Sequence, residues 1–198
     1  MTTLLDVRNA VKRKLVLNDT VYDTDIDDCI RQVLRSRNQD KLWFLERVGT
    51  LTLELDSSSV SFPASYGDIE RIDLIRSGQR SELANIPYKK LEARYYLEDP
   101  ITSGVPEAYS KVNRTLYFSH TADQVYTLPT TYYIRDETLP TLDTDTSVWF
   151  GDDGFDLVRA QATYFMRVGP MEQESASLNE VTIATQILNE KHRQFRTY

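Results

Sequence analysis

The spacing of apolar residues in the first forty positions predicts two amphipathic helices. In the segment from Thr3 to Val16, apolar side chains recur every three or four residues: Leu4, Val7, Val11 and Leu15. A second helix is predicted from near Thr24, with aspartates in its first turn and a buried stripe formed by Ile26, Ile30, Val33 and Leu34. The chain therefore opens as a helical hairpin.

The pattern changes to strict alternation after Gly49, which predicts a half-buried strand from Thr50 to Leu55. Further strands are predicted at 60–62 and 69–75, and a short helix at 89–97. We expect the apolar cluster at 41–45, with Trp43 and Phe44 at its centre, to pin the hairpin to this sheet.

Tyrosines gather in the middle of the chain, where eight of the twelve lie between Tyr88 and Tyr133. Tyrosine joins a large apolar area to a polar tip, which suits half-buried sheets and interfaces. The segment 105–136 predicts two antiparallel strands, one at 116–118 and one covering 125–134. Pro129 is expected to force a bulge or an edge position, because proline donates no backbone hydrogen bond.

The last third predicts a polar connector at 136–147 and then two helices, separated by Gly169-Pro170. The first helix is predicted at 155–168 and the second, the longest in the chain, at 171–195. The predicted fold is α+β, with a central antiparallel β meander and two C-terminal helices that form a bundle with the N-terminal pair. We expect one domain over 1–198, with a helical part at 1–47 and 148–198 and a β-rich insertion at 48–147.

The charge and cysteine content narrow the classes of function. The formal net charge of -7 argues against binding DNA by phosphate neutralisation. It fits a surface that is simply soluble, and after that a surface to which DNA does not adhere. Cys29 is the one cysteine, so no disulfide framework exists and a reducing compartment is expected. We find neither a signal-peptide core nor an apolar run of membrane-spanning length, and expect no membrane contact.

No motif in the sequence indicates catalysis. The run Asp23-x-Asp25-x-Asp27 resembles the start of a calcium loop, but it lacks the glycine at its sixth position and the glutamate at its twelfth. Helix N-terminal charge explains this run, and the acidic turn at 151–156 is expected to cap the next helix rather than bind a metal. His120 and His192 have no nucleophile at a recognised spacing. We expect no enzyme activity, no cofactor and no metal.

The order of elements resembles that of head-to-tail adaptor proteins (connector or gatekeeper proteins) of tailed bacteriophages. The resemblance spans nearly the whole chain and rests on apolar and proline patterns: 5–7 with Val11, Tyr22 with 25–30, 43–45, 60–63, 104–109, 116–118 and the paired C-terminal helices. It implies a virion structural protein that forms a ring, commonly dodecameric, beneath the portal. Such a ring extends the DNA channel, touches passing DNA non-specifically and offers a platform to a tail or nozzle protein. The expected location is the virion neck, after assembly in the host cytoplasm, and no cofactor is implied.

Two sets of residues are candidates for this function. The connector and the turn after it supply acidic candidates for a channel lining: Asp143, Asp145, Asp152 and Asp153. They fit equally a solvated loop on the outside of a ring. The C-terminal helix exceeds its predicted partner in length, so its end is a candidate portal interface: Lys191, His192, Arg193, Phe195, Arg196 and Tyr198. Alternatively, Phe195 folds back on the N-terminal helices.

Two other functions remain open on the sequence. One is a neck or tail-completion protein beyond the adaptor, which would share the acidity and the β content. The other is a tail-associated hydrolase, which an active-site cluster in a cleft would favour.

Overall fold

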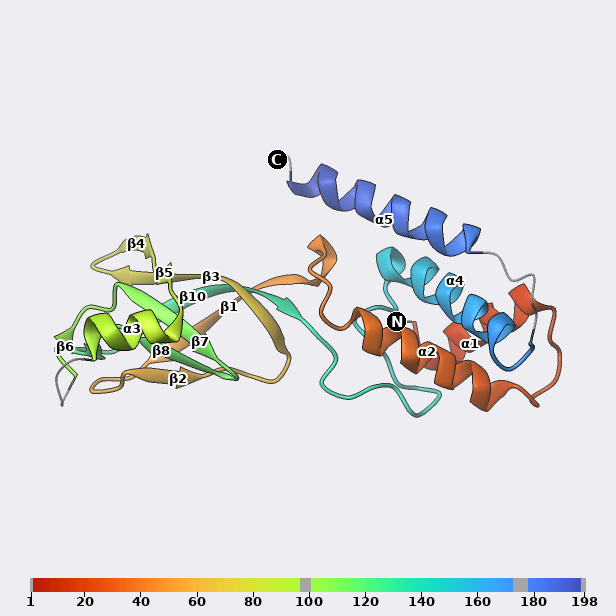
Figure 1. Cartoon of the computed structure of the whole chain (residues 1–198), viewed down its shortest axis with the longest axis horizontal. Helices are drawn as coiled ribbons and strands as arrows, with labels where there is room; N and C mark the ends of the chain where they lie inside the picture. The colour runs from red at the N-terminus through yellow and green to blue at the C-terminus, as the bar shows by residue number, and fades with distance from the viewer. Residues whose placement is uncertain (1, 97–100, 173–177, 197–198) are drawn as a thin grey trace. The chain divides into compact units, whose positions relative to one another are not determined.

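The chain forms two compact units, of which one is inserted into the other. The computed structural model describes residues 2–96, 101–172 and 178–196. The helical unit consists of Met1–Leu45 and Arg135–Tyr198, and the β unit of Glu46–Ile134 (Figure 1). The predicted α+β class, with an N-terminal hairpin and two C-terminal helices, is confirmed. The connector belongs to the helical unit, and the treatment of both units as a single domain stays a prediction.

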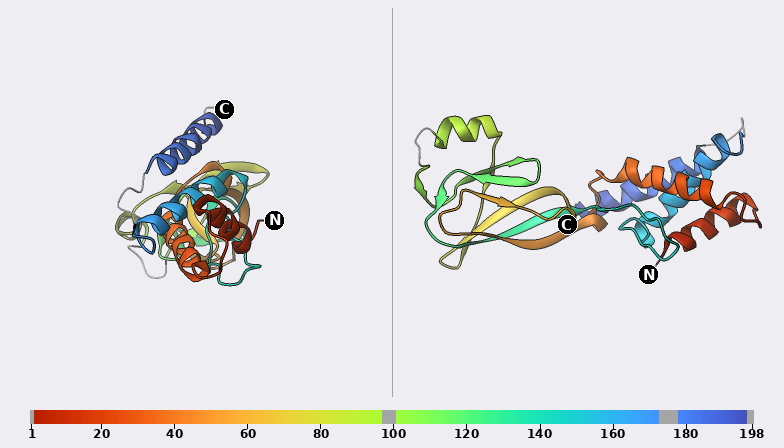
Figure 2. Two further views of the ribbon diagram at one scale, coloured as in Figure 1. Left: turned by 90° about the vertical axis from the view of Figure 1, so that its right-hand side faces the viewer. Right: turned by 90° about the horizontal axis from the view of Figure 1, so that it is seen from below.

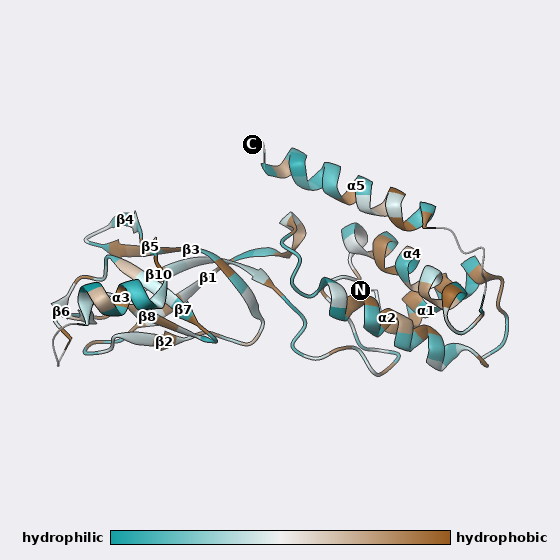
Figure 3. Ribbon diagram, viewed as in Figure 1, coloured by the Kyte–Doolittle hydropathy of each residue, from teal (hydrophilic) through white to brown (hydrophobic). Residues whose placement is uncertain are grey.

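Three helices of the helical unit bury one apolar stripe each against the others: α1 (Leu4–Leu15), α2 (Asp23–Arg37) and α4 (Asp152–Val168). Figure 2 shows them lying together, and Figure 3 shows their apolar residues. Thr3 and Asp6 form a capping box that satisfies the first free N–H groups of α1. Val16 ends the helix in the left-handed conformation, with φ of 58°.

The last two helices begin at different residues from those predicted. Helix α4 starts at Asp152. Its third residue has to be glycine, because a Cβ at Gly154 would lie 2.6 Å from the Trp149 carbonyl oxygen. Helix α5 spans Asn179–Arg196, so the prediction of a helix from Met171 was wrong at Met171 and Glu172, while residues 173–177 of that predicted helix lie outside the described residues. Met171 and Glu172 belong to the turn that ends α4, and Glu172 has φ of 50°, which a continuing helix does not allow.

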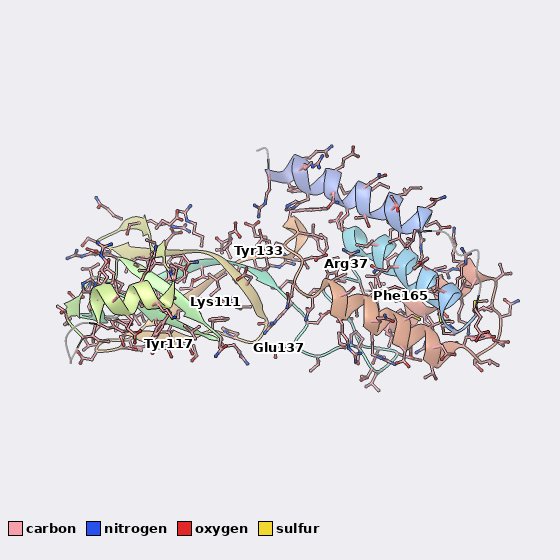
Figure 4. The ribbon with its side chains drawn as sticks, in the orientation of Figure 1. Arg37, Lys111, Tyr117, Tyr133, Glu137 and Phe165 are labelled. Atoms are coloured by element: carbon pink, nitrogen blue, oxygen red, sulfur yellow. The ribbon has the colours of Figure 1, made fainter. Side chains whose placement is uncertain are left out.

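The β unit is built from two four-stranded sheets that enclose its core. One sheet has the order β1 (Glu46–Leu53), β10 (Tyr126–Ile134), β3 (Tyr66–Arg76) and β4 (Gln79–Glu82). The other has the order β2 (Ser59–Ser61), β8 (Thr115–Phe118), β7 (Ala108–Val112) and β5 (Ala84–Asn85). A two-stranded sheet pairs β6 (Ser103–Gly104) with β9 (Thr121–Ala122), and α3 (Tyr88–Tyr95) packs on β7. Figure 4 shows Lys111 of β7, whose amine contacts Asp68 of β3 at 2.8 Å.

The tyrosine-rich segment does not form the predicted hairpin. Strand β8 pairs with β7 and β2, whereas β10 pairs with β1 and β3 in the other sheet. Pro129 accordingly lies in an inner strand, opposite Thr50 of β1. On the β3 side the pairs run from Thr127 with Ile75 to Thr130 with Ile72, and bulges follow after Thr131 and Tyr133. The missing N–H of proline is therefore accommodated within a continuous strand.

The two tryptophans have different roles from those expected. Trp149 is the fully buried one, and Phe44 packs edge-on against it with ring centroids 5.3 Å apart. Trp43, in the 3-10 helix η1 (Trp43–Leu45), is only partly buried and stacks on Phe195 of α5. The expectation that Trp43 pins the hairpin to the sheet is therefore corrected, since Trp43 binds a helix.

Replacing the two tryptophans should separate these roles. We expect Trp149→Ala to lower the free energy of unfolding by about 3–5 kcal/mol, because it empties a fully enclosed site. Trp43→Ala should cost less than half as much, since its site is open to water on one side. Urea unfolding followed by circular dichroism measures both values. Equal losses would show that Trp43 belongs to the core.

Candidate functional site on the helical unit

A buried arginine, Arg8, joins the connector to helices α1 and α2. Arg8 of α1 donates from Nε to Asp27 Oδ1 of α2 at 2.8 Å, and from Nη2 to Asp143 Oδ1 at 2.7 Å. Arg8 and Asp27 are both buried, whereas the Asp143 side chain is half exposed. The hydrogen bonds to Asp27 and Asp143 raise the pKa of Arg8 further. Asp143 thus serves as the outer carboxylate of a three-residue ion cluster.

Asp145 closes a tight turn in the connector. Its Oδ2 accepts the backbone N–H groups of Thr141 and Leu142, each at 2.8 Å. These bonds hold the pKa of Asp145 below its usual range, so the carboxylate stays ionised at neutral pH. The residue has a structural role in the turn, and its charge remains near the surface.

The two sets of candidate residues meet at the start of α4. Lys191 Nζ of α5 lies 3.0 Å from Asp153 Oδ1 of α4. One predicted channel residue is thus the ion-pair partner of one predicted portal residue. The backbone of Asp152 belongs to α4, and its side chain falls outside what the structure describes.

The end of α5 contacts the helical unit through aromatic side chains. Phe195 stacks on Trp43 with centroids 5.5 Å apart and an interplanar angle of 15°, and His192 lies 6.1 Å from Trp43. Phe195 nevertheless keeps 65% of its surface exposed. Arg193 and Arg196 are also exposed, and Tyr198 lies outside the described residues.

A second group of exposed apolar residues lies on the side of α5 away from Leu188. Ile183 and Ile187, one helical turn apart, are each about half exposed. The side chains of α5 border an open hollow of about 380 Å³ there, lined by Ile183, Gln186, Ile187, Asn189, Glu190 and Arg193. Helix α5 therefore has apolar side chains on two faces.

The remaining reactive residues are accounted for by local structure. Burial raises the pKa of the Cys29 thiol to about 11, which leaves it protonated and unreactive at neutral pH. His120 Nδ1 lies 3.0 Å from the adjacent Ser119 hydroxyl, and that hydroxyl also accepts the Glu107 N–H. Across the residues that the structure describes, no cluster of three His, Cys, Asp or Glu side chains could hold a metal ion.

The ion cluster was missed by the sequence prediction, although a signal for it exists. Arg8 is four residues after Leu4 and three before Val11, so it lies on the buried stripe of α1. A charge on such a stripe implies a buried partner. Asp27 was assigned to helix N-terminal charge, and its position beside Ile26 and Ile30 is the corresponding signal on α2.

Removing Arg8 should be far more damaging than removing the exposed carboxylate. We expect Arg8→Met to lower the free energy of unfolding by about 3–5 kcal/mol, because it leaves Asp27 buried without its cation. Asp143→Asn should cost at most about 1 kcal/mol, since its side chain is half solvated. Urea titrations of the two variants test this, and similar losses would contradict the central position of Arg8.

Comparisons with known proteins identify the family of the chain. The chain gives no match among curated proteins. Among the described residues, no helix combines the length and apolar character needed to span a membrane. The SU10 adaptor protein family matches residues 2–186, which include both helices of the hairpin, the whole β unit, α4 and the start of α5. The chain therefore belongs to the SU10 adaptor protein family and is a phage structural protein of the head–tail region.

Proposed function

We propose that this protein assembles into a dodecameric ring that joins the portal to the tail and extends the DNA channel. The observation that carries the proposal is the family match over residues 2–186, since the family is one of structural adaptors. Members of such a family contact other head and tail proteins. In the proposed arrangement one face of the ring meets the portal and the other meets a tail or nozzle protein. The ring assembles in the host cytoplasm before it becomes part of the neck.

We assign the portal contact to the last two turns of α5. Phe195 is largely exposed although it stacks on Trp43, and an exposed aromatic side chain beside cations is typical of an interface. Arg193 and Arg196 provide those cations. The candidates from Lys191 to Tyr198 lie beyond the residues that the family matches, so the assignment rests on their own chemistry.

We assign the channel lining to the acidic connector. DNA passes most easily along a wall that does not bind phosphate, and negative charge provides such a wall. Asp143 and Asp145 both belong to the connector, and Asp145 is held in its ionised form. Asp143 shares the one charge of Arg8 with Asp27, so the three-residue cluster keeps a net negative charge, whereas Asp153 has Lys191 as its own ion-pair partner.

Imaging the purified protein with the portal of the same phage tests the ring directly. A ring on the narrow end of the portal is the expected result. Particles that never associate would overturn the proposal.

Truncation after Glu190 tests the portal contact. We expect the shortened chain to keep its fold, with a circular dichroism signal lowered only by the loss of the helical residues 191–196, because Leu188, the buried residue of α5, remains. Its binding to immobilised portal should fall at least tenfold. The double variant Ile183→Ala and Ile187→Ala, which changes the other face of α5, is the matched control and should bind as before. Unchanged binding by the truncated chain would assign the contact elsewhere.

Neutralising the connector tests the channel assignment. Asp143→Asn with Asp145→Asn removes two charges from each copy while keeping the side-chain shape and one acceptor oxygen at each position. We expect virions with these changes to eject DNA more slowly, and most clearly at low salt, because screening weakens with falling ionic strength. Asp19→Asn with Asp28→Asn makes the same charge change at exposed positions outside the connector. Equal ejection rates in the two sets of virions would place the connector outside the channel.

A further inference from the structure

Strand β4 lies at one end of a four-stranded sheet and has an open side. It is the last strand in the order β1-β10-β3-β4, and within the described part of the chain it pairs with β3 alone (Figure 1). An open edge is a template for another extended strand, and proteins commonly guard such edges with lysines, proline or a bulge. Strand β4 has none of these guards. All four of its side chains are exposed: Gln79, Arg80, Ser81 and Glu82.

Both ends of β4 are fixed in place. At its start a two-residue turn joins it to β3, and Ser77 and Gly78 of this turn have φ of 51° and 78°. Positive φ at both positions is typical of the tight hairpin turns that match the twist of a sheet. At its end Leu83 is buried and donates its N–H to the Ile72 carbonyl of β3 at 2.9 Å. Little conformational freedom is therefore lost when a further strand binds to this edge.

The backbone groups on the open side belong to Arg80 and Glu82. Successive residues of a strand direct their N–H and C=O groups to opposite sides. The Leu83 N–H points to β3, so the groups of Ser81 point there as well. Those of Arg80 and Glu82 point to the open side. Their side chains share one face of the sheet with Asp73, which lies opposite Glu82 in β3.

A buried carboxylate positions the arginine of this edge. The Asp73 side chain is 1% exposed, and it accepts hydrogen bonds from Arg80 Nε at 2.7 Å and Arg71 Nε at 2.8 Å. Arg71 Nε in turn lies 3.4 Å from Glu82 Oε2. The side chains of Arg80 and Glu82 are still more than half exposed. The edge thus presents a cation and an anion, two residues apart on one face.

This order of charges is complementary to itself. When two copies of β4 pair antiparallel about Ser81, Arg80 of each copy lies opposite Glu82 of the other. Both residues direct their backbone groups to the open side, so the same register forms four hydrogen bonds between the copies. A shift by two residues would place Arg80 opposite Arg80, or Glu82 opposite Glu82, and like charges disfavour both arrangements. We propose that β4 binds the β4 of a second copy about Ser81, so that two copies share one continuous sheet.

This dimer goes beyond the proposed ring and does not rest on it. A two-fold contact uses the same patch on both copies and is complete with two chains, whereas a ring needs a head-to-tail contact. The strand is short, so the contact belongs to the small and reversible class of interfaces. The dimer is a form of the chain outside the ring, and it covers an edge that would otherwise be open to other strands.

A disulfide on the two-fold axis tests the register. Ser81 faces Ser81 of the second copy in a non-hydrogen-bonded pair, where Cα atoms lie about 4.5 Å apart, a distance that a disulfide spans. The full chain is prepared with Ser81→Cys in a Cys29→Ala background and is oxidised mildly. We expect a covalent dimer at about twice the 22.9 kDa of one chain, with a yield severalfold above that of Gln79→Cys. Gln79 is exposed on the same strand, but the register places it opposite Leu83.

A charge reversal at Glu82 tests the ion pairs. In sedimentation equilibrium we expect the mass of the unchanged chain to rise with concentration from 22.9 kDa towards twice that value. Glu82→Lys places a lysine opposite Arg80 and should raise the apparent dissociation constant at least tenfold. It keeps the contacts of Asp73 with Arg71 and Arg80, so the circular dichroism spectrum should not change. Glu54→Lys makes the same charge change at an exposed position and is the control, which should associate as before.

The outcomes separate this contact from others. A chain that stays at the mass of one copy throughout the concentration series would overturn the dimer. A dimer that Glu82→Lys leaves unchanged would lie on another surface and would overturn the pairing of β4. Equal yields from Ser81→Cys and Gln79→Cys would show random collision and would also overturn it. None of these results decides whether the ring forms, because imaging with the portal tests the ring separately.

Discussion

The helical unit depends on one arginine that faces two carboxylates. Arg8 joins α1 to α2 through Asp27 and to the connector through Asp143. Backbone hydrogen bonds also join α1 to the connector. The Leu4 N–H donates to the Asp145 carbonyl at 2.8 Å, and the Leu5 N–H donates to the Asp143 carbonyl at 3.2 Å. Those N–H groups belong to the first turn of α1, where the helix itself provides no carbonyl to accept them. The connector therefore completes α1 and sets the point from which α4 begins.

Polar contacts continue along the connector, which has few apolar side chains to bury. Asp136 accepts the Ser147 hydroxyl and the Val148 N–H. Burial raises the pKa of Asp136, and these two bonds oppose the rise. The Asn38 amide donates to the Asp136 carbonyl, which ties the connector to the end of α2. Charge in this segment is thus used mainly to position the backbone, and Asp143 keeps an exposed side.

The sequence was most informative where structure is local. Helical periodicity and capping residues located α1, α2, α3 and α4 to within a few residues, because those patterns depend on neighbours in the chain. Strand pairing was not accessible in the same way. The partner of β10 is β1, about eighty residues earlier, and nothing in the tyrosine-rich segment distinguishes that strand from β8. Pro129 pointed to a bulge or an edge position, whereas it lies in an inner strand between the Thr127–Ile75 and Thr130–Ile72 partners.

The candidate residues were predictable as a set but not in their contacts. Exposed cations near the end of α5 and acids in the connector could be read from composition, since both avoid burial. Their pairing could not be read, because Lys191 and Asp153 come together only through the packing of α5 on α4. The start of α5 was also misplaced, since the residues after Gly169-Pro170 have good helical propensity and only the backbone of Glu172 reveals the turn.

The insertion of the β unit has a consequence for synthesis. The α1–α2 hairpin leaves the ribosome before the β unit, but the helix that covers its apolar stripe starts at Asp152, after the entire β unit. At about 5–20 residues per second, the hairpin remains uncovered for roughly 5–25 s. During that interval the β unit already has all its strands and can fold. The α1–α2 hairpin is thus synthesised before the β unit but packs against α4 only after it. Until then its exposed apolar stripe is open to chaperones.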